Sequence, residues 1–313
     1  MTKPFRQSKG IICNKKKYKP ENHLEKHIEQ ENNGLEKIMR KTVFILIIAV
    51  MVLFVVPLNA ELPNVESLMS RALDAVTSRV LSQKMMIIVK DKDKITSQMT
   101  AGVARKRISD GDRSIRSIIV LLEPAEVRGT AYLFSFSGGS TFDQWIYFPY
   151  IGRVKKVMGA GVFESFLGTD FRLSDLVGLQ LQGAHKLIGE ETISGVPVYK
   201  IETTPQNKEA SLYSRIIIWI AKDTYYPIRQ DYYDLSGNLW KRQQYDEITI
   251  VNKLAVPTVI RILDLKDETS TELKMTEINT GEQLLNDKMF MPEQLMYSLE
   301  CPVWERVCYP VKK

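Results

Sequence analysis

Short segments rich in Val, Ile, Thr, Tyr and Phe follow one another along most of the chain, separated by Gly, Pro, Asn or Asp. Such segments are typical of β-strands, and their close spacing with few helical stretches between them favours antiparallel pairing. We predict strands at 84–90, 96–107, 113–122, 129–137, 143–150, 153–158, 184–192, 196–203, 213–222, 226–234, 239–250, 255–264 and 270–279.

Helical patterns are few. Residues 62–83 repeat apolar side chains every three or four positions, as an amphipathic helix does, and Asn64 is a suitable N-cap. Shorter helices are predicted near 171–179 and 281–289. The sequence therefore predicts an α+β fold with one long antiparallel sheet and a few helices on one face.

Two of the predicted strands, "RIIIWIA" (215–221) and "TAYLFSF" (130–136), are apolar on both faces. An antiparallel sheet with one face in water alternates apolar and polar residues instead. The helix at 62–83 can cover one face, whereas the other needs a second layer, a closed barrel interior or a ligand. A two-sided core and a ligand cavity both remain open at this point.

The N-terminal region has the features of an export signal. Residues 39–60 join Arg40 and Lys41 to an apolar run and end at Ala60, which predicts a cleaved signal peptide. An uncleaved anchor at 42–58 is the alternative, although the apolar run is short for a bilayer span. Residues 1–38 form a polar leader that is either disordered or untranslated, with Met39 as the true start.

The net charge of +6 belongs to the leader, because residues 61–313 contain equal numbers of basic and acidic side chains. A neutral body lacks the basic field that supplies non-specific nucleic-acid affinity, so we expect no nucleic-acid partner. Cys301 and Cys308 are the only cysteines after the leader, and in an exported protein they predict a disulfide.

Catalytic patterns are sparse. His185 is the only histidine of the body, and no nucleophile elbow, phosphate loop or zinc-binding motif occurs. Asp170 is interpreted as a helix cap, and Asp175 as a partner of local backbone groups. We predict a protein that is not an enzyme, with no cofactor and no metal.

One block carries a resemblance to a known family: "LLEPAEVRGTAYLFSFS", "DQWIYFPYIGRVKKV" and "FLGTDFRLSDL", in that order within 121–176. It resembles the LolA-like proteins, the outer-membrane lipoprotein-sorting family of the periplasm. The end of the chain, "INTGEQLLNDKMFMPEQL", is also similar to that family. The resemblance extends over 61–300, and the tail 301–313 has no counterpart.

The resemblance implies a half-open antiparallel barrel whose helices close one side over a hydrophobic cavity. It also implies a periplasmic carrier that shields the acyl chains of lipoproteins or other lipids. The alternative is an envelope module that docks onto a lipid-exporting transporter of the inner membrane. The predicted cavity lining is Phe134, Phe136, Trp145, Tyr147, Phe163, Phe166, Ile217 and Trp219. The cations Arg153, Lys155 and Lys156 are predicted to meet lipid head groups.

Overall fold

The computed structural model describes the body at residues 63–77, 81–109, 114–137, 141–158, 164–172, 175, 183–205, 211–252, 254–280 and 285–300. In the leader it describes 34, 37 and 39–44, which are helical. The chain divides into two compact units, Met1–Leu62 and Pro63–Lys313. Among the described residues, no helix combines the length and the apolar character that a membrane span requires. Most of the predicted signal peptide (39–60) and the whole predicted disulfide between Cys301 and Cys308 lie outside the described residues.

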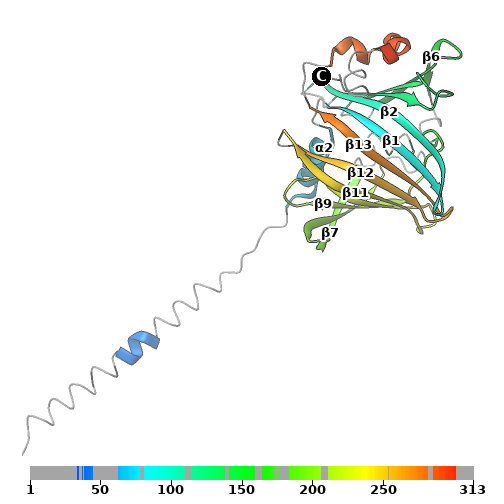
Figure 1. Cartoon of the computed structure of the whole chain (residues 1–313). Helices are drawn as coiled ribbons and strands as arrows, with labels where there is room; N and C mark the ends of the chain where they lie inside the picture. Colours follow the sequence, from blue (N-terminus) through cyan, green and yellow to red (C-terminus); the bar gives the residue numbers. More distant parts are fainter. Residues whose placement is uncertain are drawn as a thin grey trace, which may run out of the picture. The chain divides into compact units, whose positions relative to one another are not determined.

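A single sheet of 13 antiparallel strands forms the body (Figure 1). The strands are β1 (Leu81–Asp91), β2 (Lys94–Ser109), β3 (Ser114–Glu123), β4 (Ala131–Ser137), β5 (Thr141–Phe148), β6 (Arg153–Val157), β7 (Ala184–Ile193), β8 (Val196–Thr204), β9 (Arg215–Ala221), β10 (Pro227–Tyr233), β11 (Leu239–Val251), β12 (Leu254–Asp264) and β13 (Thr269–Asn279). In the described part of the body, helix α2 (Val65–Thr77) precedes the strands, and the 3-10 helices η4 (Asp287–Phe290) and η5 (Pro292–Glu300) follow them.

The order of the strands explains how the sheet is covered. Strands β1 to β6 run outward from the middle to one edge, and β7 to β13 return from the other edge until β13 pairs with β1. The segment between β6 and β7, here called the crossover, therefore joins the two edges. Because β6 and β7 do not pair with each other, the sheet stays open as a curled half-barrel, as predicted.

Every predicted strand is present with its ends shifted by a few residues. The predicted helix at 62–83 is correct at its start, where the Asn64 side chain accepts hydrogen bonds from the backbone N–H groups of Glu66 and Ser67. Its end is wrong, because α2 stops at Thr77 and β1 begins at Leu81. The segment from Leu81 pairs with β2 on one side and, from Ser82, with β13 on the other, which outweighs its helical pattern.

The two faces of the sheet have different covers. The inner face, defined here as the face under α2 and the crossover, carries one apolar cluster around Ile87 and Leu273 and a second one beneath α2. The outer face carries a cluster under η4 and η5 and a small one around Trp219. Each face of the sheet thus has its own cover, and this explains why strands such as β4 and β9 are apolar on both sides.

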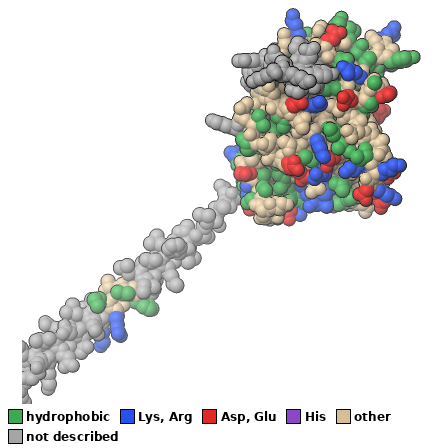
Figure 2. Space-filling model, in the orientation of Figure 1, with side chains coloured by type: hydrophobic (Ala, Val, Ile, Leu, Met, Phe, Trp, Pro, Cys, Tyr) green, Lys and Arg blue, Asp and Glu red, His purple; other side chains and the backbone are tan. Residues whose placement is uncertain are grey.

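Elsewhere the outer face is ionic. Side chains of both signs are mixed over the visible surface (Figure 2). Asp231 of β10 accepts paired hydrogen bonds from Arg229, at 3.0 and 2.6 Å, and from Arg242 of β11, at 2.9 Å each. Burial by itself raises the pKa of Asp231, but these bonds and charges outweigh it and hold that pKa below its ordinary value.

This lowered pKa predicts an acid-sensitive contribution to stability. Since the carboxylate form is favoured in the folded state, its contribution is complete above the unfolded pKa and is lost as the pH falls through the folded pKa. Urea unfolding between pH 6 and pH 2 measures it. We expect Asp231→Asn to flatten this part of the pH profile, and an unchanged profile would contradict the assignment.

Candidate functional site

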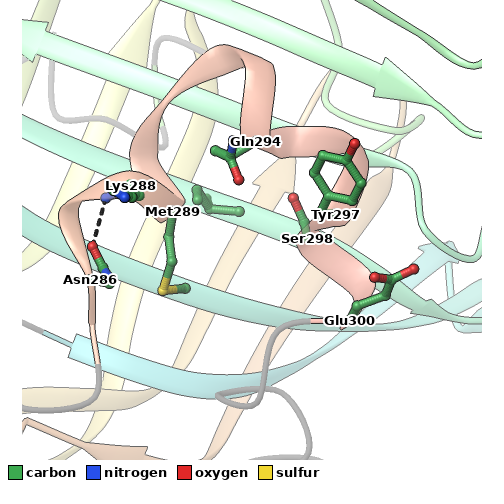
Figure 3. Close-up of a pocket in the computed structure, with 8 residues that line it drawn as sticks. Asn286, Lys288, Met289, Gln294, Tyr297, Ser298 and Glu300 are labelled. Atoms are coloured by element: carbon green, nitrogen blue, oxygen red, sulfur yellow. Dashed lines mark hydrogen bonds between the residues drawn. The ribbon is translucent and has the colours of Figure 1, made fainter.

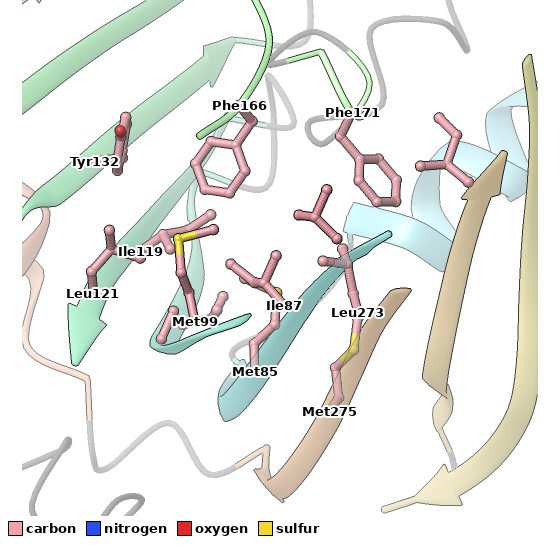
Figure 4. Packing of buried hydrophobic residues seen from close by; sticks show 14 of the residues in the cluster. Met85, Ile87, Met99, Ile119, Leu121, Tyr132, Phe166, Phe171, Leu273 and Met275 are labelled. Carbon is pink, nitrogen blue, oxygen red and sulfur yellow. The ribbon is translucent and has the colours of Figure 1, made fainter. Parts of the chain in front are cut away.

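The site begins with an apolar surface on the inner face, here called the inner cluster. Register places its residues on one side of the sheet, since Ile87 pairs with Met99 on one neighbour and with Leu273 on the other. Phe166 and Phe171 of the crossover pack onto it from above (Figure 4). Its buried members are Met85, Ile87, Val89, Met99, Ala101, Val103, Ile119, Leu121, Tyr132, Phe134, Phe166, Phe171, Ile262, Leu273 and Met275.

The inner cluster contains three methionines, Met85, Met99 and Met275, on adjoining strands (Figure 4). Methionine is unbranched and flexible, so it fills irregular space and adapts to different contacts. Aromatic rings cover the far end, where Tyr132 meets Phe166 edge to face at 5.2 Å between ring centroids. This surface can change its packing more easily than one built from β-branched residues.

Beside the inner cluster, α2 covers the remaining part of the inner face. Leu68, Met69 and Ala72 of α2 pack against Ile216, Ile218 and Tyr232. Two arginines of β2 hold the end of this helix: Arg105 donates to the carbonyl of Val76 at 2.7 Å, and Arg107 pairs with Asp74 at 3.3 Å.

The crossover is held by a polar network that links it to β11, β12 and β13. The carboxylate of Asp170 accepts hydrogen bonds from the hydroxyls of Thr269 and Thr271, the latter at 2.7 Å. Lys241, only 2% exposed, donates to the Asp170 carbonyl at 2.6 Å and lies 3.8 Å from the Asp264 carboxylate. The predicted role of Asp170 as a helix cap is therefore wrong, because its side chain binds distant strands.

Burial shifts the acid–base behaviour of this network. It lowers the pKa of Lys241, while the charges of Asp175 and Asp264 act in the opposite direction. Burial also raises the pKa of Asp175, whose carboxylate accepts from the backbone of Arg172, as predicted, and from the hydroxyl of Tyr213 at 3.2 Å. The network is a set of mutual contacts between crossover and sheet, which fits a structural role.

Gln144 is a polar exception on the inner face. It pairs with Phe134, so its side chain shares the face of the inner cluster, and it is 0% exposed. Neither its amide nitrogen nor its amide oxygen has a hydrogen-bond partner among the described residues. Buried amides are normally satisfied, so Gln144 is suited to a polar group of a bound molecule.

Because the amide of Gln144 is unpaired within the described part of the chain, we expect an apolar replacement at this position to stabilise the unliganded protein. Gln144→Leu removes two unsatisfied polar atoms from an apolar surrounding, and should raise the free energy of unfolding by about 1–2 kcal/mol. Chemical denaturation of the unliganded protein tests this. Gln294→Leu in η5 is the control and should have a small effect; a destabilised Gln144→Leu would show that the amide is satisfied.

The predicted cavity lining is divided among three clusters. Phe134 and Phe166 belong to the inner cluster, and Phe136 lies on the same face of β4. Trp145 and Tyr147 pack on the outer face under η5, and Ile217 and Trp219 form the small outer cluster. The seven described residues therefore do not form one surface, because alternation turns neighbouring positions of a strand to opposite faces. Phe163 lies outside the described residues.

The predicted head-group cations lie on the edge strand β6, also on both sides. Arg153 and Lys155 are exposed, and Lys155 pairs with Ile146 of the inner face. Lys156 pairs instead with Asp143 at 2.6 Å and lies 5.3 Å from the centroid of the Trp145 ring. Their contact with lipid head groups stays a prediction.

A separate pocket of about 310 Å³ lies on the outer face between η4, η5 and Ile118 of β3 (Figure 3). Its lining mixes charged, amide and apolar side chains: Asn286, Lys288, Met289, Gln294, Tyr297, Ser298 and Glu300. Such a lining offers less continuous apolar surface than the inner cluster does.

Groups that could support catalysis or hold metal are scarce in the described part of the chain. His185 forms a contact of 3.0 Å with the hydroxyl of Thr203 and lies half-buried on the edge strand β7. Within the described residues, no group of three His, Cys, Asp or Glu side chains lies close enough together to hold a metal ion.

A curled antiparallel half-barrel with helical cover over an apolar inner face defines the class of fold. Solved structures with this fold include a DUF1329 family protein from Desulfovibrio piger, which is 25% identical with a TM-score of 0.67 over 74% of this chain and 98% of its own. A putative outer membrane lipoprotein-sorting protein domain from Vibrio parahaemolyticus is 22% identical with a TM-score of 0.67. The match covers 74% of this chain and 100% of that domain. A LolA superfamily protein from Nitrosomonas europaea is 20% identical with a TM-score of 0.57, covering 72% and 97%.

A family model described as "Uncharacterized protein" matches residues 113–296. No curated protein matches the chain. The chain belongs to the family that this model describes. Its fold is that of the LolA superfamily and outer membrane lipoprotein-sorting structures, which its sequence motifs also resemble. The block that carries the resemblance contains the end of β3, the strands β4 to β6, and Asp170 of the network that holds the crossover.

Proposed function

We propose that this protein is a periplasmic carrier that shields the acyl chains of lipoproteins or other lipids on its inner face. The observation that carries this proposal is the inner cluster, an apolar surface with three methionines that is covered by Phe166 and Phe171 of the crossover and lies beside the part of the inner face that α2 covers. Each methylene removed from water contributes about 0.8 kcal/mol. A broad apolar surface can therefore bind an acyl chain without directional bonds.

Loading requires the cover to move, because the inner cluster is buried in this structure. Among the described residues, Asp170 and Lys241 make polar contacts that hold the crossover, and Arg105 and Arg107 make polar contacts that hold α2. A ligand or a partner that binds the open form better shifts the balance toward it. This provides a route for both uptake and release.

Overpacking the inner cluster tests the proposal. Ala101 and Ala104 both lie on β2 and are 0% exposed. Ala101 belongs to the inner cluster, whereas Ala104 belongs to the outer-face cluster under η4 and η5. We expect Ala101→Phe to weaken binding of a fluorescent fatty acid at least about tenfold by occupying its space, whereas Ala104→Phe keeps it. Each change should cost about 1–3 kcal/mol of stability, so the pair is matched.

Native mass spectrometry of the protein purified without detergent provides a second readout, in which a bound acyl lipid is expected. Failure to bind any acyl probe, together with capture of an inner-membrane transporter, would instead support the docking module. Equal loss of binding in both alanine variants would place the acyl chain elsewhere.

A further inference from the structure

A small pocket of about 70 Å³ opens on the inner face beside the C-terminal end of α2. Its lining is apolar except for Gln83 of β1, Arg105 of β2 and Tyr226. Two of its apolar residues connect it to the inner cluster, since Met275 is a member and Ile260 packs against it. The pocket therefore adjoins the surface that we propose for acyl chains.

Arg105 brings an uncompensated cation to this pocket. Its guanidinium has five N–H donors, of which the structure uses one, for the carbonyl of Val76. Within the described residues, no carboxylate pairs with Arg105, whereas its neighbour Arg107 meets Asp74. Burial lowers the pKa of Arg105, and Tyr226 and Tyr245 act against that shift. The contact with the end of α2 uses one donor, and the other N–H groups have no hydrogen-bond partner among the described residues.

Gln83 supplies a second, independent observation. It is 6% exposed, and its amide oxygen has no hydrogen-bond partner among the described residues. Register places it beside Arg105 on the inner face, since Leu81 pairs with Arg105 and Gln83 pairs with Val103. A buried acceptor without a donor is unfavourable, because its lost contact with water is not replaced. A hydroxyl or water that accompanies an acidic head group satisfies it.

We propose that Arg105 anchors an acidic head group, a carboxylate or a phosphate, whose acyl chain extends over the inner cluster. This proposal rests on the proposed carrier function and specifies its ligand. A guanidinium binds either acid in a paired geometry. The pocket is large enough for a head group but not for an acyl chain. Met275 and Ile260 line the pocket and also contact the inner cluster, so the acyl chain can extend past them.

Three probes with the same oleoyl or oleyl chain test the anchor on the full chain: oleate, oleoyl lysophosphatidic acid and oleyl alcohol. We expect the wild-type protein to bind at least one acid about tenfold more tightly than the alcohol, as a charge-assisted contact provides. Preference for oleate identifies a carboxylate ligand, and preference for the lysophosphatidic acid identifies a phosphate. Arg105→Gln should abolish the preference while keeping the affinity for the alcohol, which also shows that the variant is folded.

Arg107→Gln is the matched control, because it removes a neighbouring contact of α2 but leaves the cation of the pocket. It should keep the preference for the acid, and Arg105→Lys should keep part of it. Equal binding of all three probes by the wild-type protein overturns the anchor and leaves the carrier function intact. A preference that survives in Arg105→Gln also overturns it. Binding of none of the probes overturns the carrier function itself.

Discussion

Replacing Lys241 with alanine is expected to lower the free energy of unfolding by about 3 kcal/mol, because removing one partner of a buried ion pair leaves the other charge uncompensated. Lys241 is 2% exposed and Asp264 is 5% exposed, so water cannot replace the lost charge. The change also removes the hydrogen bond to the Asp170 carbonyl. Urea denaturation at neutral pH measures the effect.

Lys222→Ala provides the comparison, since Lys222 pairs with Glu190 at the surface. Exposed pairs contribute at most about 1 kcal/mol, so this variant should stay close to the wild-type protein. Similar losses in the two variants would show that the burial of Lys241 does not determine its contribution.

Asp170→Ala is expected to loosen the crossover. The change removes the two hydrogen bonds from Thr269 and Thr271 to a charged acceptor, at a cost of about 2 kcal/mol. Phe166 and Phe171 then cover the inner cluster less tightly. We expect a rise in the fluorescence of a hydrophobic dye and a faster uptake of fatty acid.

The control for this variant is Asp143→Ala, which removes an exposed pair with Lys156 and no contact of the crossover. It should leave dye fluorescence and uptake unchanged. If Asp170→Ala is destabilised without any gain in dye binding, the crossover does not act as a cover.

The strands could be predicted because most of them are rich in β-branched and aromatic residues and are bounded by turn residues, which is a local property. The orientation of each strand could not, because the period of two allows either face to point inward. In β5 the large Trp145 was predicted to line the cavity, but it lies on the outer face, and the residue that faces the inner cluster is the polar Gln144. In β9 alternation is equally uninformative, since Ile216 and Ile217 are both apolar.

The network that holds the crossover depends on distant residues. Asp170 meets Thr271, 101 residues further on, and nothing local distinguishes that threonine from others. Lys241 lies in a strand with charged neighbours, so its burial follows only from its register opposite Asp264. Likewise, Arg105 stands in the basic stretch "ARKRIS" and could not be told from Lys106 without the sheet.

The location of a bound acyl chain tests the account most directly. A fatty acid with a photoactivatable group at its chain end, bound to the full chain and cross-linked, labels the residues that it contacts, which peptide mass spectrometry identifies. If the inner face carries the acyl chain, labels are expected on the inner cluster, at Met85, Met99 or Met275. Labels confined to the outer face, at Trp219 or around Tyr297, would contradict it.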